Sequence, residues 1–215
     1  AAPDFALMWD NAYCLHEVYG QFVPFRDMLT LCREAGNADM VYEFASTSKI
    51  TFPGAGVAVM AASEANLKYL SGLLGAQTIS YDKVNQLRHV RFLQDKAHVL
   101  ELMQRHAAIL RPKFEAVLAA LRGIAPLGIA SWTEPKGGYF VSCDAMPGTA
   151  KRTLALCAGA GVTMTPAGAT YPGGNDPADS NIRIAPSFPP VEELEQAMQI
   201  FCLALRMAAL EKLGI

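Results

Sequence analysis

One lysine stands at the end of an apolar run, in a position that suits covalent chemistry. The stretch FASTSKITFPGAGV, residues 44–57, places Lys49 after Ser46, Thr47 and Ser48 and before a proline–glycine bend. A buried or half-buried lysine without a carboxylate partner has a pKa below the ordinary value of about 10.4, so its amine can become a nucleophile and form a Schiff base. The hydroxyls before it can donate hydrogen bonds to an anion. The alternative is a surface lysine in a Ser/Thr turn.

A carboxylate and a phenol follow the first apolar run. In WDNAY, residues 9–13, Asp10 ends what we expect to be a buried strand, and Tyr13 comes three residues later. An ionised carboxylate there needs a cation or several hydrogen-bond donors. Ligands of α/β sheets bind at such strand ends, so both side chains could face one ligand. The alternatives are a turn or helix-cap acid and a packing aromatic.

Three motifs in order resemble one enzyme family. Asp-x-x-Tyr, Ser-x-Ser-Lys and NIRIAPS, residues 181–187, resemble the fold-type I pyridoxal-phosphate enzymes, specifically the aminotransferases related to aspartate aminotransferase. STSKIT followed by GAGV is similar to the bacterial aspartate aminotransferase branch. The resemblance covers nearly the whole chain. It implies transfer of an amino group from an amino acid, with aspartate as the first candidate, to a 2-oxo acid, with pyridoxal 5′-phosphate as the cofactor.

The resemblance implies a role for each residue of the cofactor site. Lys49 would form the aldimine with the cofactor aldehyde and move the proton between the substrate Cα and the cofactor. Asp10 would pair with the pyridine nitrogen and keep it protonated. Tyr13 would hydrogen-bond the cofactor 3-oxygen. Ser46 and Ser48 would surround the phosphate.

Arg183, in NIRIAPS, would bind the substrate α-carboxylate, because a planar guanidinium suits a bidentate ion pair. Taken alone, it would be an exposed strand arginine. Many relatives have a phosphate-binding arginine seven or eight residues after the lysine, where this chain has Gly56 and Val57. The family's phosphate loop, ring-stacking aromatic and 3-oxygen asparagine precede the Asp-x-x-Tyr strand. We therefore expect the C-terminal half of such an enzyme, which as a full-length family member would be a homodimer.

Apolar periodicity predicts the elements that position these residues. Residues 1–90 read as part of an α/β domain, with a mostly parallel sheet and covering helices. Its strands, FALMW, MVYEFA and GVAVMAA, should be buried on both faces. A helix-like segment covers 25–35, and a helix at 64–74 has Ser63 as its N-cap and Gly75 as its stop.

The pattern of predicted helices and strands changes in the second half of the chain. A long helical pattern over 84–121 contains Pro112, which predicts a kink or break near Arg111. We assign 91–122 to a connecting helix and 123–215 to a small α+β domain. The elements expected in that domain are a strand at 138–143, a helix at 149–159, a loop at 165–180, a strand at 181–185 and a helix at 191–212. Residues 171–180 of the loop could close over a substrate or be an ordinary solvent loop.

Composition limits the class of protein. The 215 residues are 52% hydrophobic and 18% charged, which excludes disorder. A net charge of −2 with scattered basic residues argues against nucleic acid or an anionic membrane as a partner. No apolar run approaches the roughly 18 residues of a membrane span. Five widely spaced cysteines without CxxC or metal-ligand spacing predict reduced thiols, a cytoplasmic protein and no metal site.

Two other functions stay open at this stage. Another fold-type I chemistry, such as β-elimination or decarboxylation, would use the same Lys49 and Asp10. An aminotransferase-like effector domain of a transcription regulator would bind the cofactor without turnover. A basic winged helix upstream would indicate the regulator, and a small substrate-covering segment would indicate the enzyme.

Overall fold

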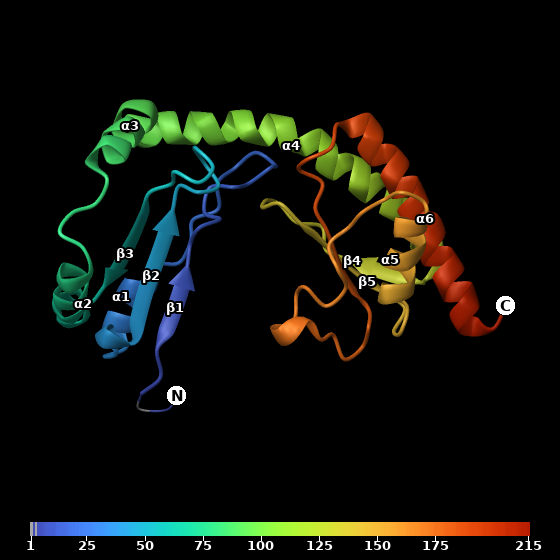
Figure 1. Ribbon diagram of the computed structural model, residues 1–215, viewed down its shortest axis with the longest axis horizontal. Helices are drawn as coiled ribbons and strands as arrows, with labels where there is room; N and C mark the ends of the chain where they lie inside the picture. The colour runs from blue at the N-terminus through green and yellow to red at the C-terminus, as the bar shows by residue number, and fades with distance from the viewer. Residues whose placement is uncertain (1, 3) are drawn as a thin grey trace. The chain divides into compact units, whose positions relative to one another are not determined.

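The computed structural model describes residue 2 and residues 4–215, which form two compact units. The first contains the described residues of 1–16 together with Gln21–Gln104, and the second contains Glu17–Gly20 and Arg105–Ile215. Figure 1 shows the elements of each unit. The division at 1–90, 91–122 and 123–215 stays a prediction.

The first unit contains a three-stranded sheet in the order β1 (Leu7–Asp10), β2 (Val41–Ser46) and β3 (Ala58–Ala62). Strands β1 and β2 are parallel, whereas β2 and β3 are antiparallel. The expected mostly parallel sheet is therefore wrong for these three strands. The reason is the short connection over residues 47–57, because a parallel crossover needs about a dozen residues or more and usually a helix.

The strands of this sheet are less buried than expected. In β1 the side chains alternate between half-buried and exposed, and Met8 is 73% exposed. In β2 only Val41 is fully buried. The expectation of burial on both faces is wrong here, because β1 and β3 are edge strands of the described sheet. The helices α1 (Met28–Glu34) and α2 (Glu64–Gln77) pack on β2 and β3 respectively.

The capping residues fix where helices of this unit begin. The Asp27 carboxylate accepts the Thr30 N–H at 2.9 Å, so α1 starts after Asp27 rather than at Phe25. Ser63 caps α2 as predicted, by accepting the Asn66 N–H. The predicted stop at Gly75 is wrong, because α2 continues to Gln77. A single-turn 3₁₀ helix, η1 (Ala38–Met40), precedes β2.

The long helical pattern forms two helices, α3 (Lys83–Leu93) and α4 (Lys96–Ile124). The chain breaks at Gln94, whose φ is 56°, and Asp95 caps α4 by accepting the His98 N–H. Of the kink or break expected near Arg111, the break is wrong, because α4 runs through Pro112, while the kink stays a prediction. Phe114, Val117 and Leu121, just beyond the proline, are 0% exposed. Their packing outweighs the one backbone hydrogen bond that proline removes.

The second unit contains an antiparallel sheet and two further helices, as the predicted α+β pattern requires. The sheet order is β4 (Ala130–Trp132), β5 (Val141–Ala145) and β6 (Asn181–Ile184). The helices α5 (Ala150–Gly159) and α6 (Val191–Leu213) begin and end within a residue or so of the predicted ranges. Only the strand expected at 138–143 is displaced, since β5 starts at Val141. Short 3₁₀ helices lie at η2 (Ala125–Leu127) and η3 (Pro172–Gly174).

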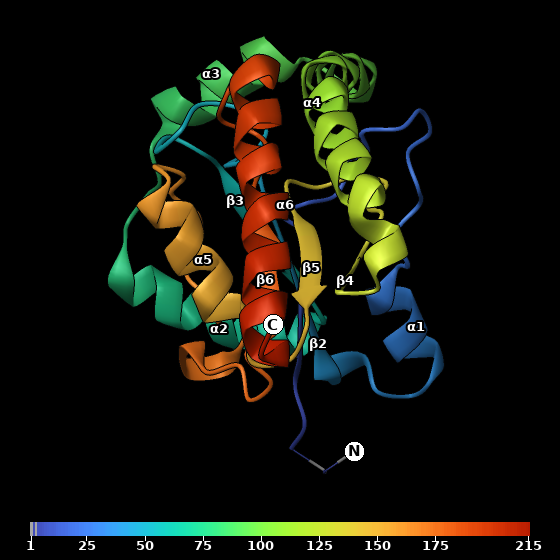
Figure 2. The same ribbon diagram turned by 90° about the vertical axis from the view of Figure 1, so that its right-hand side faces the viewer.

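One hydrophobic core holds the second unit together. It is formed by the inner face of β5 and β6, by α5, by α6 and by the part of α4 after residue 105. Figure 2 shows α6 beside both α5 and this part of α4, and the Cys202 thiol donates to the Ala120 carbonyl at 3.6 Å. Val18, from the segment Glu17–Gly20, also lies in this core and is 1% exposed. Its N–H donates to the Lys136 carbonyl, and its carbonyl accepts from Arg111 Nε.

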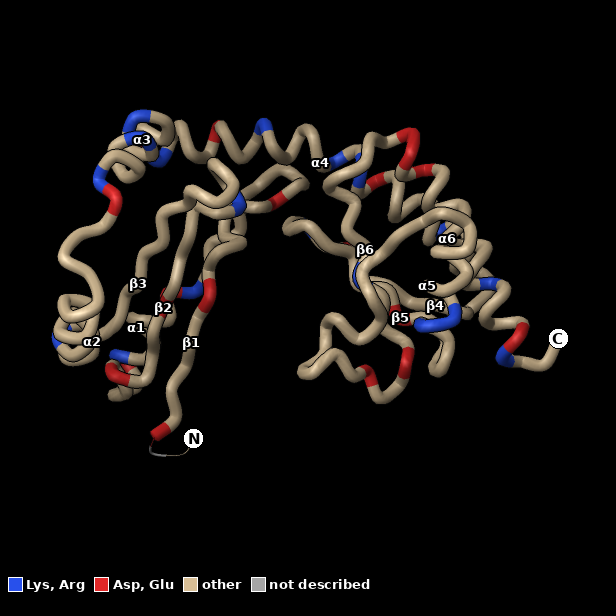
Figure 3. Tube along the Cα trace, in the orientation of Figure 1, with Lys and Arg blue, Asp and Glu red and all other residues tan. Residues whose placement is uncertain are grey.

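Charges and thiols follow the sequence-based expectations where the structure describes them. Figure 3 shows basic and acidic residues spread over both units rather than gathered in one block. All five cysteines carry free thiols, and four of them are buried. Within the described residues, no helix has the length and apolar character needed to cross a membrane.

Candidate active site

The register of β1 and β2 brings two predicted site residues to one edge of the first sheet. Asp10 ends β1 and is paired with Phe44 of β2, while Ser46 ends β2 two residues later. Paired residues of parallel strands face the same side, and side chains alternate along a strand. Asp10 and Ser46 therefore lie on the same face, at the carboxyl ends of neighbouring parallel strands, where ligands of α/β sheets bind.

The turn after β1 is tied to β2 by hydrogen bonds. The Asn11 N–H donates to the Phe44 carbonyl at 2.7 Å, and the Asn11 side-chain amide donates to the Glu43 carboxylate. The Asp10 carboxylate accepts the Ala12 N–H at 2.9 Å. Asp10 itself is exposed, so the expectation that it ends a buried strand is wrong for the described chain. These bonds fix the direction in which the Asp10 carboxylate projects from the end of β1.

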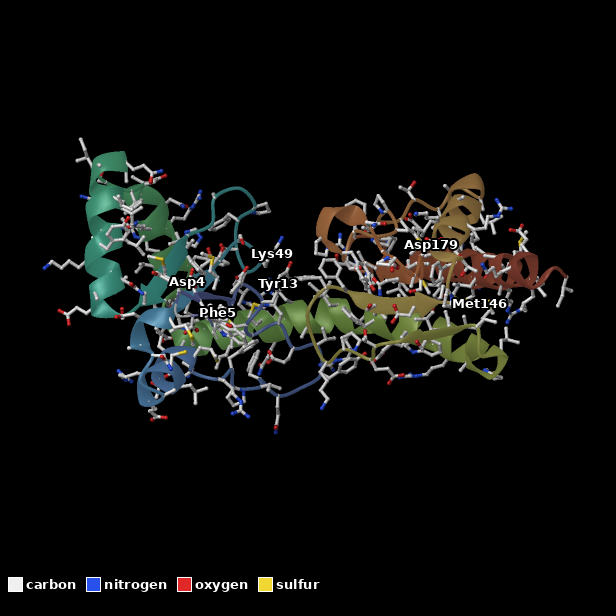
Figure 4. The ribbon with its side chains drawn as sticks, turned by 90° about the horizontal axis from the view of Figure 1, so that it is seen from below. Asp4, Phe5, Tyr13, Lys49, Met146 and Asp179 are labelled. Carbon is white, nitrogen blue, oxygen red and sulfur yellow. The ribbon has the colours of Figure 1, made fainter. Side chains whose placement is uncertain are left out.

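Tyr13 follows on the same turn. The residue is 41% exposed, and its ring packs edge-on against the His16 ring, with 5.7 Å between the centroids. His16 is 5% exposed, and its Nδ1 lies 2.8 Å from the Cys14 carbonyl. Figure 4 shows the Tyr13 and Lys49 side chains in the same region of the first unit. The buried histidine thus supports the tyrosine ring while leaving part of it accessible.

Lys49 lies in a single helical turn, which we call the lysine turn, residues 47–51. The Ile50 and Thr51 N–H groups both donate to the Thr47 carbonyl at 2.9 Å. Thr47 also exchanges hydrogen bonds with Val57, which closes the loop behind the turn. Lys49 is exposed, so the expectation of a buried or half-buried amine is wrong. The physical reason is that the turn leaves β2 at the sheet edge and carries Lys49 outward.

Two serine hydroxyls meet beside the lysine turn. Ser46 Oγ donates to Ser48 Oγ at 2.8 Å and accepts the Ser48 N–H at 3.0 Å. Gly56 packs against this pair, and a Cβ at position 56 would lie 3.1 Å from Ser48 Cα. An arginine at position 56, as in many relatives by resemblance, would need the Ser48 backbone to move. Glycine at position 56 therefore fits the close approach of this segment to Ser48.

Helix α3 contacts the lysine turn and the loop that follows it through two side chains that the sequence analysis did not identify. His89 is 5% exposed, and its Nε2 lies 2.9 Å from Thr51 Oγ1. Asn85, one helical turn earlier, donates from its side chain to the Ala55 carbonyl at 2.9 Å. Their spacing of four residues, which places both on one helix face, is the sequence signal that could have indicated them.

Arg183 belongs to the second unit and is described there alone. It lies on β6 opposite Ser142, and its guanidinium carbon is 4.5 Å from the centroid of the Phe140 ring. Its Nε is buried and has no hydrogen-bond partner among the described residues. The residue lines a cavity of about 470 Å³ together with Met164, Phe188 and other side chains. A buried donor without a partner fits an anionic ligand such as a carboxylate.

The loop before Arg183 is held in place by side-chain hydrogen bonds. The Asp176 carboxylate accepts the N–H groups of Ala178, Ser180 and Asn181, and these bonds lower the pKa of that carboxyl. The Asn181 side chain donates to Ser142 and Asp144 and accepts from Thr170. This loop, which could close over a substrate by the sequence pattern, is thus anchored at its C-terminal end.

The family model described as aspartate amino-transferase matches residues 1–214 of the chain. This chain belongs to the aspartate aminotransferase family. The predicted residues of the cofactor site, namely Asp10, Tyr13, Ser46, Ser48 and Lys49, all come from the end of this family member's first sheet, whereas Arg183 comes from its second unit.

Relatives and solved structures agree with that membership. A Mycolicibacterium smegmatis protein named as an aminotransferase is 49% identical over 214 residues, covering 99% of this chain and 50% of its own. The crystal structure of an aspartate transaminase from Corynebacterium glutamicum is 46% identical, with a TM-score of 0.96 over 99% of this chain and 50% of its own. This aspartate aminotransferase family member therefore spans about half the length of the curated relatives it matches.

A more distant structure shares the fold. It is the α-aminoadipate aminotransferase of Thermus thermophilus, complexed with N-(5′-phosphopyridoxyl)-L-leucine. It is 24% identical, with a TM-score of 0.75 over 95% of this chain and 51% of its own. At this identity the likeness concerns the α/β fold of this family member and not its site.

Proposed function

We propose that this chain forms the catalytic lysine half of a pyridoxal-phosphate-dependent aminotransferase. The enzyme moves an amino group from an amino acid, with aspartate as the first candidate, to a 2-oxo acid. The observation that carries the proposal is the register of β1 and β2, which joins Asp10 and the strand leading to Lys49 at one sheet edge. Membership of the aspartate aminotransferase family supports it.

The side chains at this edge fit pyridoxal 5′-phosphate. A primary amine can hold the cofactor aldehyde, and that amine is Lys49. A carboxylate on the neighbouring strand end, Asp10, suits the ring nitrogen, and the accessible phenol of Tyr13 suits the 3-oxygen. The paired hydroxyls of Ser46 and Ser48 suit part of the phosphate shell. The cofactor, when bound, supplies an acceptor for the electrons left when the substrate Cα–H bond breaks.

Each residue then has a physical task. The Lys49 amine would act as the base that takes the proton from the substrate Cα. Asp10 would keep the ring nitrogen protonated through its negative charge, and Tyr13 would hydrogen-bond the 3-oxygen. Arg183 binds the substrate α-carboxylate with its planar fork, and its unpartnered Nε supports this role.

The proposal also concerns the full-length enzyme. Because the chain spans about half the length of its curated relatives, we propose that the full-length protein supplies further groups that stack on the ring and neutralise the phosphate. We also propose that it works as a homodimer in the cytoplasm. Gly56 adds to the need for another phosphate cation, since glycine carries no charge and a side chain at position 56 would lie tightly against Ser48.

Borohydride trapping tests the proposal directly. The full-length protein is incubated with pyridoxal 5′-phosphate, reduced and mapped by peptide mass spectrometry. We expect a phosphopyridoxyl adduct on Lys49, and no adduct at that peptide in Lys49→Ala. An adduct on Lys83 or Lys136, or none, would refute the assignment. Half-reaction spectra with a panel of amino acids then show whether aspartate converts the bound cofactor faster than the others do.

A further inference from the structure

His89 is a buried histidine that the proposed reaction does not use. It lies on α3, it is 5% exposed, and its ring contacts the segment that follows the lysine turn. The Phe52 ring packs edge-on against it, with 5.6 Å between the centroids. Arg88 lies over the same Phe52 ring, with its guanidinium carbon 4.5 Å from the ring centroid. A polar ring in such surroundings needs hydrogen bonds for both nitrogens.

Both ring nitrogens have partners. Nδ1 lies 2.9 Å from the Asn85 carbonyl, and Nε2 lies 2.9 Å from Thr51 Oγ1. A carbonyl only accepts, so Nδ1 carries the hydrogen and donates to Asn85. In the neutral ring Nε2 is then an acceptor, and the Thr51 hydroxyl donates to it. The histidine therefore fixes the orientation of one hydroxyl at the end of the lysine turn.

Thr51 connects this histidine to Lys49. Its backbone N–H donates to the Thr47 carbonyl, as does the N–H of Ile50, and these two bonds form the turn that carries Lys49. The Thr51 hydroxyl also lies 3.1 Å from the same carbonyl. The hydroxyl donates to this carbonyl and also contacts His89 Nε2, which is the nearer of the two at 2.9 Å, so its one hydrogen is shared between them. The bond to His89 thus fixes the last residue of the turn from outside.

We propose that His89 is a positioning residue for Lys49: it holds the lysine turn in shape by binding the Thr51 hydroxyl from α3. The inference rests on the proposed function, since it concerns the lysine that would hold the cofactor. Positioning matters there because a reacting amine displaced by about 1 Å can lose on the order of a hundredfold in rate.

The test compares two histidine variants in the full-length protein. In His89→Gln the side-chain amide reaches the place of Nε2 and keeps a bond to Thr51, whereas in His89→Asn it reaches only the place of Nδ1. Hydrogen exchange is measured at the Ile50 and Thr51 amides without added cofactor. We expect exchange at least tenfold faster in His89→Asn and within threefold of wild type in His89→Gln. The Asn11 amide, which bonds β2, should be unchanged in both.

A second measurement follows the lysine itself. The rate at which borohydride traps pyridoxal 5′-phosphate on Lys49 should fall at least tenfold in His89→Asn and Thr51→Val, and should recover in His89→Gln and Thr51→Ser. His98→Gln is the control, because His98 is an exposed histidine that contacts Asp95. The double variant His89→Asn/Thr51→Val should trap the cofactor no more slowly than either single variant, since both substitutions remove the same bond.

The outcomes separate the two proposals. If wild type traps no cofactor on Lys49, the proposed function fails, while the exchange data still report on the turn. If wild type traps cofactor but His89→Gln and His89→Asn behave alike in both measurements, the positioning role is overturned. Equal acceleration of the Asn11, Ile50 and Thr51 amides would overturn it too, since it would mean that His89 supports the unit as a whole.

Discussion

Gly56 lies so close to Ser48 that a Cβ at position 56 would come 3.1 Å from Ser48 Cα and 3.3 Å from Ser48 Cβ. Ser48 is at the same time bonded through its hydroxyl and its N–H to Ser46. The glycine therefore presses against the backbone of the residue that precedes Lys49. Any side chain there would disturb the hydroxyl pair that we assign to the phosphate.

Gly56→Ala should destabilise the protein by about 1–3 kcal/mol, the usual effect of overpacking, and should weaken binding of pyridoxal 5′-phosphate. Gly72→Ala in α2 is the matched control, because a Cβ there meets no atom within 4 Å. That change should stabilise the helix by about 0.5–1 kcal/mol. Urea unfolding and cofactor titration measure both effects, and equal stability of the two variants would contradict the close contact.

Asp10→Ala should lower transamination by several orders of magnitude while the fold is retained. The reason is that the ring nitrogen loses the carboxylate that keeps it protonated, which weakens the electron acceptor. Asp10 is exposed, so water can replace it as the acceptor for the Ala12 N–H. Asp4→Ala, at an exposed acid before β1, is the control. Activity of Asp10→Ala within tenfold of wild type would show that the strand end is only structural.

How far the sequence determined the fold depends on the range of the interactions involved. Ser63 and the helix at 191–212 were predictable because capping and helical periodicity are local. The break at Gln94 was missed although its cap is equally local, because the helical pattern over 84–121 outweighed the capping signal of Asp95. The break predicted from Pro112 was wrong because the burial of Phe114 keeps the helix intact. That burial depends on residues far away in the chain.

The candidate site was also predictable only where local sequence features determine it. Residue types and spacing identified Lys49, Asp10 and Tyr13 as groups for one ligand, but only strand pairing places them at one edge, and pairing is a non-local property. The exposure of Lys49 was missed because the apolar residues before it belong to β2, which ends at Ser46, three residues earlier. His89 was missed because its partner Thr51 lies 38 residues away.

Arg183→Lys should weaken amino-acid binding about tenfold or more and leave formation of the Lys49 adduct intact. Lysine keeps the charge but loses the planar fork and the contact with the Phe140 ring. Arg152→Lys is the control, since Arg152 forms an exposed ion pair with Glu211. Amino-acid titration of the cofactor spectrum measures the affinity. Normal binding, or loss of the cofactor in place of the amino acid, would show that Arg183 has another role.

The buried thiols predict how stability depends on pH. Burial, together with the charges of Asp144 and Cys202, raises the pKa of Cys143 to about 12, and burial raises the pKa of Cys157 to about 11. Above pH 9 the unfolded chain therefore ionises these thiols before the folded chain does. The free energy of unfolding should be fully retained below that pH and should fall between pH 9 and 12, with a slope of up to about 1.4 kcal/mol per pH unit for each thiol.

Cys143→Ala should reduce this slope, because it removes one of the thiols, while it also lowers stability at pH 8 by leaving a small cavity. Ile182→Val is the control, since it removes volume from the same core but no thiol, and it should lower stability equally at every pH. Urea unfolding between pH 8 and 11 gives the slopes. An unchanged slope in Cys143→Ala would mean that this thiol ionises at the same pH in both states.

Val18 enters a hydrophobic core whose other residues are all synthesised after it. It is buried among residues of 114–205, yet it belongs to a segment that is translated before all of them. At roughly 5–20 residues per second, on the order of ten seconds or more pass before α6 has been made. During that interval the core around Val18 is incomplete, because it lacks the residues of α6. The second unit therefore closes only after α6 has been made, on a segment that was synthesised well before its partners.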